Sequence, residues 1–100
     1  MNKLLCLLVF YATLNCSAYA PTGKPTASGI YPQVGHCAVD RINGQAIPFG
    51  TRITLPDGQV LIVADRFGGN YNNHLDIFMA NESACWQFGR RWLRCRIEIP

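Results

Sequence analysis

Charged residues are scarce in this 100-residue sequence. Only 15% of its residues are charged, and nine Lys and Arg against six Asp and Glu leave a net charge of +3. This positive charge is too small and too dispersed to indicate a nucleic-acid partner, so we expect none. The length allows one domain with a small core. Because 49% of the residues are apolar, the chain does not belong to the disordered class.

Several motifs that carry chemistry are also absent. No Gly-x-Ser-x-Gly turn is present, which argues against a serine hydrolase, and no glycine motif of the phosphate-binding kind occurs. The two histidines, His36 and His74, do not combine with the cysteines in a spacing typical of zinc ligands. We therefore expect neither a metal nor another cofactor.

The first 20 residues have the pattern of a targeting segment. One lysine precedes an apolar run over Leu4–Leu14, which is too short to span a bilayer comfortably. Ala18-Tyr19-Ala20 has the small-x-small pattern of a signal-peptidase site. Pro21 is unfavourable directly after a cut, so cleavage after Ala18 is an alternative to cleavage after Ala20.

This pattern divides the chain into three parts. We predict a signal peptide over residues 1–20, a short linker over 21–25 and one domain over 26–100. The protein is then exported to the periplasm or the extracellular medium. We expect no stable membrane insertion after the signal is removed.

Export changes how the cysteines are interpreted. In this prediction Cys6 and Cys16 leave with the signal, whereas Cys37, Cys85 and Cys95 enter an oxidising compartment. Three cysteines allow one disulfide by three pairings, worth about 2–4 kcal/mol, and leave one cysteine over. The odd cysteine is either buried or forms a disulfide with another chain. That chain is then an accessory protein, or a second copy in a covalent dimer.

After residue 25, short apolar runs alternate with turn residues. Pro56-Asp57-Gly58 predicts a tight turn between strands over Thr51–Leu55 and Gln59–Ala64. Asn81 is suited to cap a short helix over Glu82–Phe88, which a glycine ends. The other predicted strands are Thr26–Tyr31, His36–Asp40, His74–Met79 and Trp92–Ile99. About six strands and one short helix predict a small closed β-barrel.

Three aspartates are the residues best suited to chemistry. Asp76 stands in the apolar setting Leu75-Asp76-Ile77-Phe78, where desolvation would raise its pKa and keep it protonated as a general acid. Strand alternation offers the opposite interpretation, with Asp76 in solvent. Asp65 can accept hydrogen bonds from the N–H groups of the glycine-rich loop that follows it, and Asp40 can cap the next Asn-Gly turn.

Four segments in order carry a family resemblance. They are Thr26–Gly29; Cys37–Asp40 followed by Ile47–Thr51; Ala64–Gly69 leading to Leu75–Phe78; and Phe88–Arg91. Together they resemble the three-aspartate domain and its relative, the domain of rare lipoprotein A, over residues 26 to about 99. Both families are double-psi β-barrels that act on peptidoglycan. The resemblance implies an all-β fold, a six-stranded double-psi barrel with one short helix.

The resemblance also implies an activity. The three-aspartate domain forms the catalytic barrel of membrane-bound lytic transglycosylase A, so we expect cleavage of peptidoglycan glycan strands between MurNAc and GlcNAc with a 1,6-anhydro product. Asp76 takes the place of the catalytic acid, Asp65 that of its supporting carboxylate and Asp40 that of the third aspartate. The residues expected to contact the glycan are Thr26, Arg66, Phe67 and Tyr71.

Departures from the family pattern leave other functions open. The family usually has Asp-Thr-Gly-Gly where this chain has Asp65-Arg66-Phe67-Gly68, so either the loop runs differently or Phe67 forms a wall of the groove. A non-catalytic, expansin-like glycan-binding barrel is the second candidate. The third is an interaction protein, such as an inhibitor or an accessory factor. We expect Trp86 and Trp92 to lie in the core rather than to bind sugar.

Overall fold

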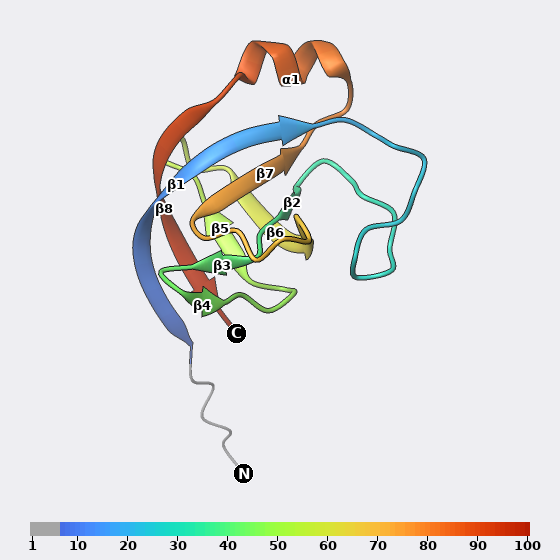
Figure 1. The fold of residues 1–100 in the computed structure, drawn as a ribbon. Helices are drawn as coiled ribbons and strands as arrows, with labels where there is room; N and C mark the ends of the chain where they lie inside the picture. Colours follow the sequence, from blue (N-terminus) through green and yellow to red (C-terminus); the bar gives the residue numbers. More distant parts are fainter. Residues whose placement is uncertain (1–6) are drawn as a thin grey trace.

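The computed structural model describes residues 7–100 and shows a small barrel with one helix at its end (Figure 1). The elements are β1 (Leu8–Tyr19), β2 (His36–Ala38), β3 (Arg41–Ile42), β4 (Gln45–Ala46), β5 (Arg52–Thr54), β6 (Val60–Asp65), β7 (His74–Phe78), α1 (Glu82–Phe88) and β8 (Arg91–Ile99). Among the described residues, no helix is long and apolar enough to cross a bilayer. Lys3 and Cys6 of the predicted signal lie outside this range.

Six strands close the barrel in the order β1-β7-β2-β6-β5-β8, and β3 and β4 form a separate two-stranded sheet. The pairs β1–β7 and β2–β6 are parallel, whereas the other four pairs of the barrel are antiparallel. This mixed topology is compatible with a double-psi barrel. The prediction of a small, mostly β, closed six-stranded barrel with one short helix is confirmed.

The start of the barrel differs from the sequence prediction. Leu8–Tyr19, expected to be most of a signal peptide, forms β1 and pairs with both β7 and β8. The barrel therefore begins at Leu8 and not at residue 26. A cut after Ala18 or Ala20 would remove the strand that joins β7 to β8. Export by this segment stays a prediction, but the closed barrel requires the segment to be retained.

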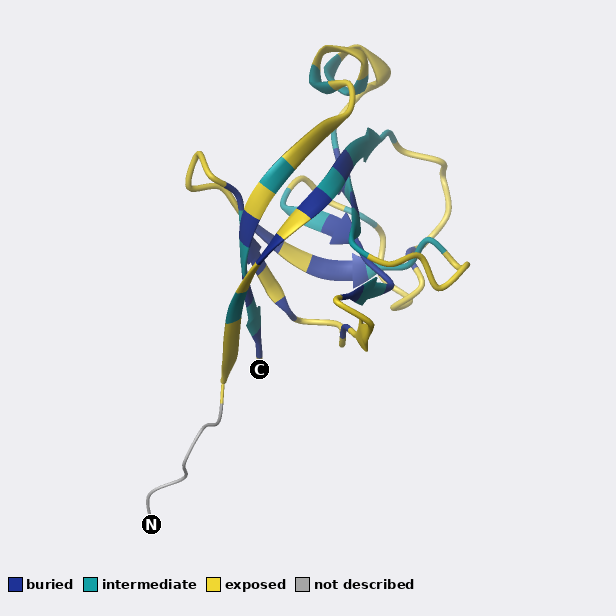
Figure 2. Ribbon diagram, turned by 60° about the vertical axis from the view of Figure 1, so that its left-hand side comes forward, coloured by how far each residue is buried: buried dark blue, intermediate teal, exposed yellow. Residues whose placement is uncertain are grey.

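A period of two along β1 explains why it forms a strand. Ala12, Leu14 and Cys16 are buried, whereas Thr13 is exposed and Asn15 is half-buried. Figure 2 shows this banding of buried and exposed positions along the barrel strands. Side chains on a strand point alternately to opposite faces, so one face of β1 fills the barrel interior. An apolar run of this length satisfies a signal peptide and a buried strand equally well.

The predicted strand over Thr26–Tyr31 is wrong, because this segment closes on itself as a turn. The Thr26 N–H and hydroxyl both donate to the Ile30 carbonyl, at 2.7 Å each, and the Gly29 N–H donates to the Thr26 carbonyl at 2.9 Å. Gly29 has φ of 92°, which favours glycine. These local bonds take up the N–H groups of Thr26 and Gly29 and the carbonyls of Thr26 and Ile30, which a strand would offer to its neighbours.

Both tryptophans lie outside the core, contrary to expectation. Trp86 on α1 is 84% exposed and Trp92 on β8 is 68% exposed. None of the residues of α1 is buried, because the helix lies beyond the end of the barrel (Figure 1). The core consists mainly of aliphatic side chains from the barrel strands, such as Leu14, Ile53, Leu61, Leu75 and Ile97.

The cysteines are also arranged differently from the prediction. All four in the described range are free thiols, so the structure contains no disulfide among them. Cys37 and Cys95 are buried in the barrel, whereas Cys85 is half-exposed on α1 and lies outside it. Cys16, assigned to the cleaved signal, is fully buried in the same core.

Candidate active site

Asp65 and Asp76 lie on either side of β2. Ala38 of β2 pairs with Asp65 of β6 on one side and with Asp76 of β7 on the other. Neighbouring strands are about 4.8 Å apart, so the two aspartate Cα atoms are about 10 Å apart. Ser17 of β1 pairs with Asp76 on its far side. We call these four residues (Asp65, Ala38, Asp76 and Ser17) the carboxylate row.

The carboxylate row faces away from the barrel core. Its chain neighbours Cys16, Cys37, Leu75 and Ile77 are buried in the core, so alternation turns the row outward. The segment after β1 lies beside this face and borders an open cavity of about 240 Å³. Its lining consists of Tyr19, Thr22, Lys24, Pro25, Pro32, Ala38, Asp65, Arg66, Phe67 and Asp76. We call this space the carboxylate cavity.

A β-bulge positions Asp65. The register between β2 and β6 shifts so that Cys37 pairs with Val63 but Ala38 pairs with Asp65. The extra residue, Ala64, accepts a hydrogen bond at its carbonyl from the Ser28 N–H, at 3.3 Å. Bulges commonly re-aim a side chain beside a functional site. Here the bulge aligns Asp65, rather than Ala64, with the carboxylate row.

Three donors anchor the Asp65 carboxylate. The N–H groups of Ala27 and Arg66 donate to Oδ1 at 2.8 Å each, and the Tyr19 hydroxyl donates to Oδ2 at 3.3 Å. Burial, followed by the nearby charge of Asp65, raises the pKa of Tyr19. The phenol therefore stays protonated and able to donate. Asp65 is held firmly by groups from three different segments.

Asp76 is in a different environment. It is half-buried, and the Ser17 hydroxyl donates to its Oδ1 at 2.9 Å. Burial is the largest influence and raises the pKa of Asp76 above its ordinary value; the charge of Asp65 adds to this, while Ser17 and Arg90 oppose it. A carboxyl group with a raised pKa can hold a proton for transfer nearer neutral pH.

Asp40 is not part of the carboxylate cavity. It is buried, and its carboxylate accepts the N–H groups of Phe67 (2.9 Å), Gly68 (3.4 Å), Gly69 (3.3 Å) and Tyr71 (3.0 Å). Burial raises its pKa, but these donors outweigh burial, so the pKa of Asp40 lies below its ordinary value. Asp40 thus binds the loop that the sequence assigned to Asp65, and it does not cap the Asn-Gly turn.

The predicted glycan-contact residues separate into two groups. Arg66 and Phe67 line the carboxylate cavity, and the Arg66 guanidinium lies 4.0 Å from the centre of the Phe49 ring. Thr26 is buried within its own turn, and Tyr71 packs against Phe67 with ring centres 5.6 Å apart. Phe67 therefore forms a wall of the cavity, whereas neither Thr26 nor Tyr71 lines it.

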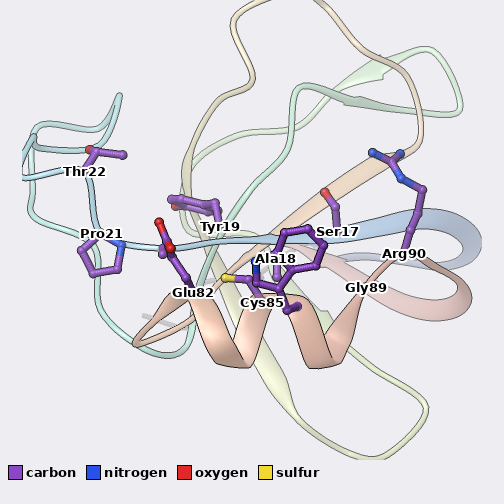
Figure 3. Close-up of a pocket in the computed structure, with 11 residues that line it drawn as sticks. Ser17, Ala18, Tyr19, Pro21, Thr22, Glu82, Cys85, Gly89 and Arg90 are labelled. Carbon is purple, nitrogen blue, oxygen red and sulfur yellow. The ribbon is translucent and has the colours of Figure 1, made fainter.

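A second, larger space adjoins the carboxylate cavity. It has a volume of about 740 Å³ and lies between the end of β1 and α1 (Figure 3). Tyr19 and Thr22 line both spaces, and Ser17, which donates to Asp76, lines the larger one. We call this space the helix cavity.

Sequence reasoning missed Ser17 and Tyr19 because both fell within the predicted signal peptide. The sequence pattern could have identified the strand, because the polar residues Thr13, Asn15 and Ser17 alternate with the buried positions of β1. That alternation is typical of a strand with one buried face.

The comparisons add no assignment to this geometry. Within residues 7–100, no group of His, Cys, Asp or Glu side chains is arranged to hold a metal ion. No protein-family model matches the chain. No curated protein matches it either.

Proposed function

We propose that the protein is an exported lytic transglycosylase of the three-aspartate, double-psi barrel type, which cleaves the MurNAc-β-1,4-GlcNAc bond of peptidoglycan. The observation that carries this proposal is the environment of Asp76. It is a half-buried carboxyl group with a raised pKa, in a cavity that it shares with the anchored carboxylate of Asp65.

In the proposed reaction, protonated Asp76 donates its proton to the glycosidic oxygen as the bond from that oxygen to the MurNAc C1 breaks. The C6 hydroxyl of the same MurNAc then attacks C1, and the Asp76 carboxylate accepts the hydroxyl proton. The product has a 1,6-anhydro bond, and Asp76 returns to its protonated state. The nucleophile belongs to the substrate, so the reaction does not require a second carboxylate to activate water.

The neighbouring residues support this role for Asp76. Ser17 donates to one oxygen of Asp76 and so orients the carboxyl group. The Asp65 charge disfavours ionisation of Asp76 and raises its pKa in addition to burial. The small Ala38 side chain leaves room between the two carboxyl groups for the scissile bond.

The test incubates the full chain, with β1 retained, with purified sacculi and analyses the soluble products by mass spectrometry. We expect products with 1,6-anhydro ends, at a rate that falls as pH rises through the raised pKa of Asp76, because the acid must be protonated. Asp76→Asn should lower the rate at least about 100-fold. Asp57→Asn, in an exposed turn away from the cavity, is the matched control and should retain the rate.

A non-catalytic glycan-binding barrel is the second candidate, favoured by the open helix cavity beside the carboxylate row. If the chain sediments with sacculi but releases no soluble product at any pH, the transglycosylase proposal fails and this binding function remains.

A further inference from the structure

The helix cavity has one wall of strand and one of helix. Residues 17–22, from the end of β1 onward, form the first wall. Glu82, Cys85, Trp86 and Gly89 form the second, followed by Arg90. Figure 3 shows the side chains of Glu82, Cys85 and Arg90 placed around this space with Ser17 and Tyr19.

The helical wall is one face of α1. Glu82, Cys85 and Trp86 follow the i, i+3, i+4 spacing that places side chains on the same side of a helix, and Gly89 caps its end. Such a face normally packs against the body of the protein. Here it borders an open cavity and leaves the Trp86 indole 84% exposed. An exposed indole at the wall of an open cavity is suited to stack on the apolar face of a planar or ring-shaped ligand.

The helix cavity has a negative residue and a positive residue at opposite ends of its helical wall. Glu82 lies at one end of α1, and Arg90 follows its other end. Arg90 shares the lining of this cavity with Ser17, which donates to Asp76, and the Arg90 charge lowers the pKa of Asp76. Among residues 7–100 the one ion pair joins Arg96 to Glu98, which leaves the Arg90 guanidinium without a carboxylate partner there.

We propose that the helix cavity is a saccharide subsite that binds a carboxylate-bearing sugar of the glycan strand, with its ring on Trp86 and its carboxylate at Arg90. This inference rests on the proposed function, which identifies the ligand as a glycan strand of peptidoglycan. It assigns to that glycan a second contact region, outside the carboxylate cavity.

The residues shared with the carboxylate cavity indicate the occupant of the helix cavity. Ser17 bonds to Asp76 and also lines the helix cavity, while Tyr19 and Thr22 line both spaces. A glycan with one bond at Asp76 would therefore have its next sugars beside the residues that border the helix cavity. MurNAc from which the stem peptide has been removed carries a free lactyl carboxylate, which suits the guanidinium of Arg90. Sugar hydroxyls suit the acceptor oxygens of Glu82 at the other end.

The test measures binding by calorimetry in the full chain carrying Asp76→Asn, so that cleavage does not interfere. One probe is the GlcNAc–MurNAc disaccharide, and the other is the GlcNAc disaccharide, which lacks the carboxylate. Trp86→Ala should weaken binding of both probes about tenfold, and Trp86→Phe should restore most of it. Arg90→Gln should weaken binding of the MurNAc probe alone.

Two matched variants control for general surface effects. Trp92 is exposed like Trp86, and Arg94 is an arginine whose guanidinium lies over the Tyr11 ring. Neither Trp92 nor Arg94 lines the helix cavity. Trp92→Ala and Arg94→Gln should bind both probes as the parent does. Equal effects of the Trp86 and Trp92 variants, or no binding of either probe to the parent, would overturn the inference. If wild type releases no anhydro product but these differences persist, the transglycosylase proposal fails while the subsite stands.

Discussion

The size of Ala38 and the surroundings of two carboxyl groups define the site at the residue scale. Ala38 pairs with both Asp65 and Asp76, and its methyl group leaves the carboxylate cavity open between them. Asp65 accepts three hydrogen bonds, two of them from backbone N–H groups, whereas Asp76 accepts one, from Ser17. Two carboxyl groups in such different environments are suited to different roles.

Asp40 contributes through the loop it holds rather than through contact with the cavity. Replacing Asp40 with Asn leaves one acceptor oxygen for four N–H groups. We expect Asp40→Asn to lower the free energy of unfolding by about 2 kcal/mol at neutral pH. Urea denaturation measures this loss, with Asp57→Asn in an exposed turn as the control.

The pH dependence of that loss follows from the pKa of Asp40. Because its folded pKa lies below the ordinary value, the carboxylate stabilises the fold above the unfolded pKa. This stabilisation disappears as pH falls through the folded pKa. The difference between wild type and Asp40→Asn should therefore shrink in acid. A difference that stays constant with pH would contradict the role of the ionised carboxylate.

At the scale of elements, β1 is the strand that supplies both barrel closure and part of the site. Its inward side chains Ala12, Leu14 and Cys16 enter the core, and its outward Ser17 and Tyr19 bond to the two site carboxylates. Loss of β1 would expose the core and remove both hydroxyl donors. Any role of this segment in export must leave it attached to the folded barrel.

Truncation tests the place of β1. A chain lacking residues 1–20 should show no cooperative unfolding transition, because it loses pairing with both β7 and β8 and exposes their edges. A chain lacking residues 1–6 is the control and should unfold cooperatively, as the full chain does. Circular dichroism during thermal unfolding measures both. A cooperative transition in the shorter chain would show that the barrel forms without β1.

Helix α1 shows which features of an element the neighbouring residues determine and which they do not. The sequence predicted Glu82–Phe88 with an Asn81 cap and a glycine end, and all three are confirmed: Asn81 Oδ1 accepts the Ala84 N–H at 2.9 Å, and the Gly89 N–H donates to the Cys85 carbonyl. These signals depend on residues within a few positions of one another. The exposure of Trp86 was not predicted, because it depends on what the helix faces.

At the scale of the whole molecule, burial divides the thiols into two classes. Cys16, Cys37 and Cys95 have no exposed surface, whereas Cys85 is half-exposed and lines the helix cavity. Burial raises the pKa of the Cys37 thiol. Hydrogen bonding with Cys95, followed by burial, raises that of Cys16. All three interior thiols are therefore shielded from solvent, and those of Cys16 and Cys37 are also held protonated.

Alkylation measures this division. In a Cys6→Ser chain, iodoacetamide should modify one thiol, Cys85, within minutes, and the other three only after unfolding. Mass spectrometry counts the modified sites, and a chain that also carries Cys85→Ser is the control, in which no fast modification is expected. Fast modification of a second thiol in the folded chain would contradict the burial of the cysteines in the core.

Local chemistry was sufficient for much of this fold. The Pro56-Asp57-Gly58 turn, the caps of α1 and the barrel strands from His36 onward follow from residues close together in the sequence, and each was predicted. The short strands β3 and β4 were not predicted. Asp65 and Asp76 were singled out from the sequence as candidate site residues, and the structure places both at one cavity.

Tertiary structure decided the other features of the fold and the site, because those features depend on which strands pair and in what register. Leu8–Tyr19 suits a signal peptide or a buried strand, and only its pairing with β7 and β8 selects the strand. The bulge at Ala64 brings Asp65 level with Ala38. Asp40 reaches its loop partners 27 to 31 residues along the chain. Such distances depend on the closed barrel, and no local pattern of residues specifies them.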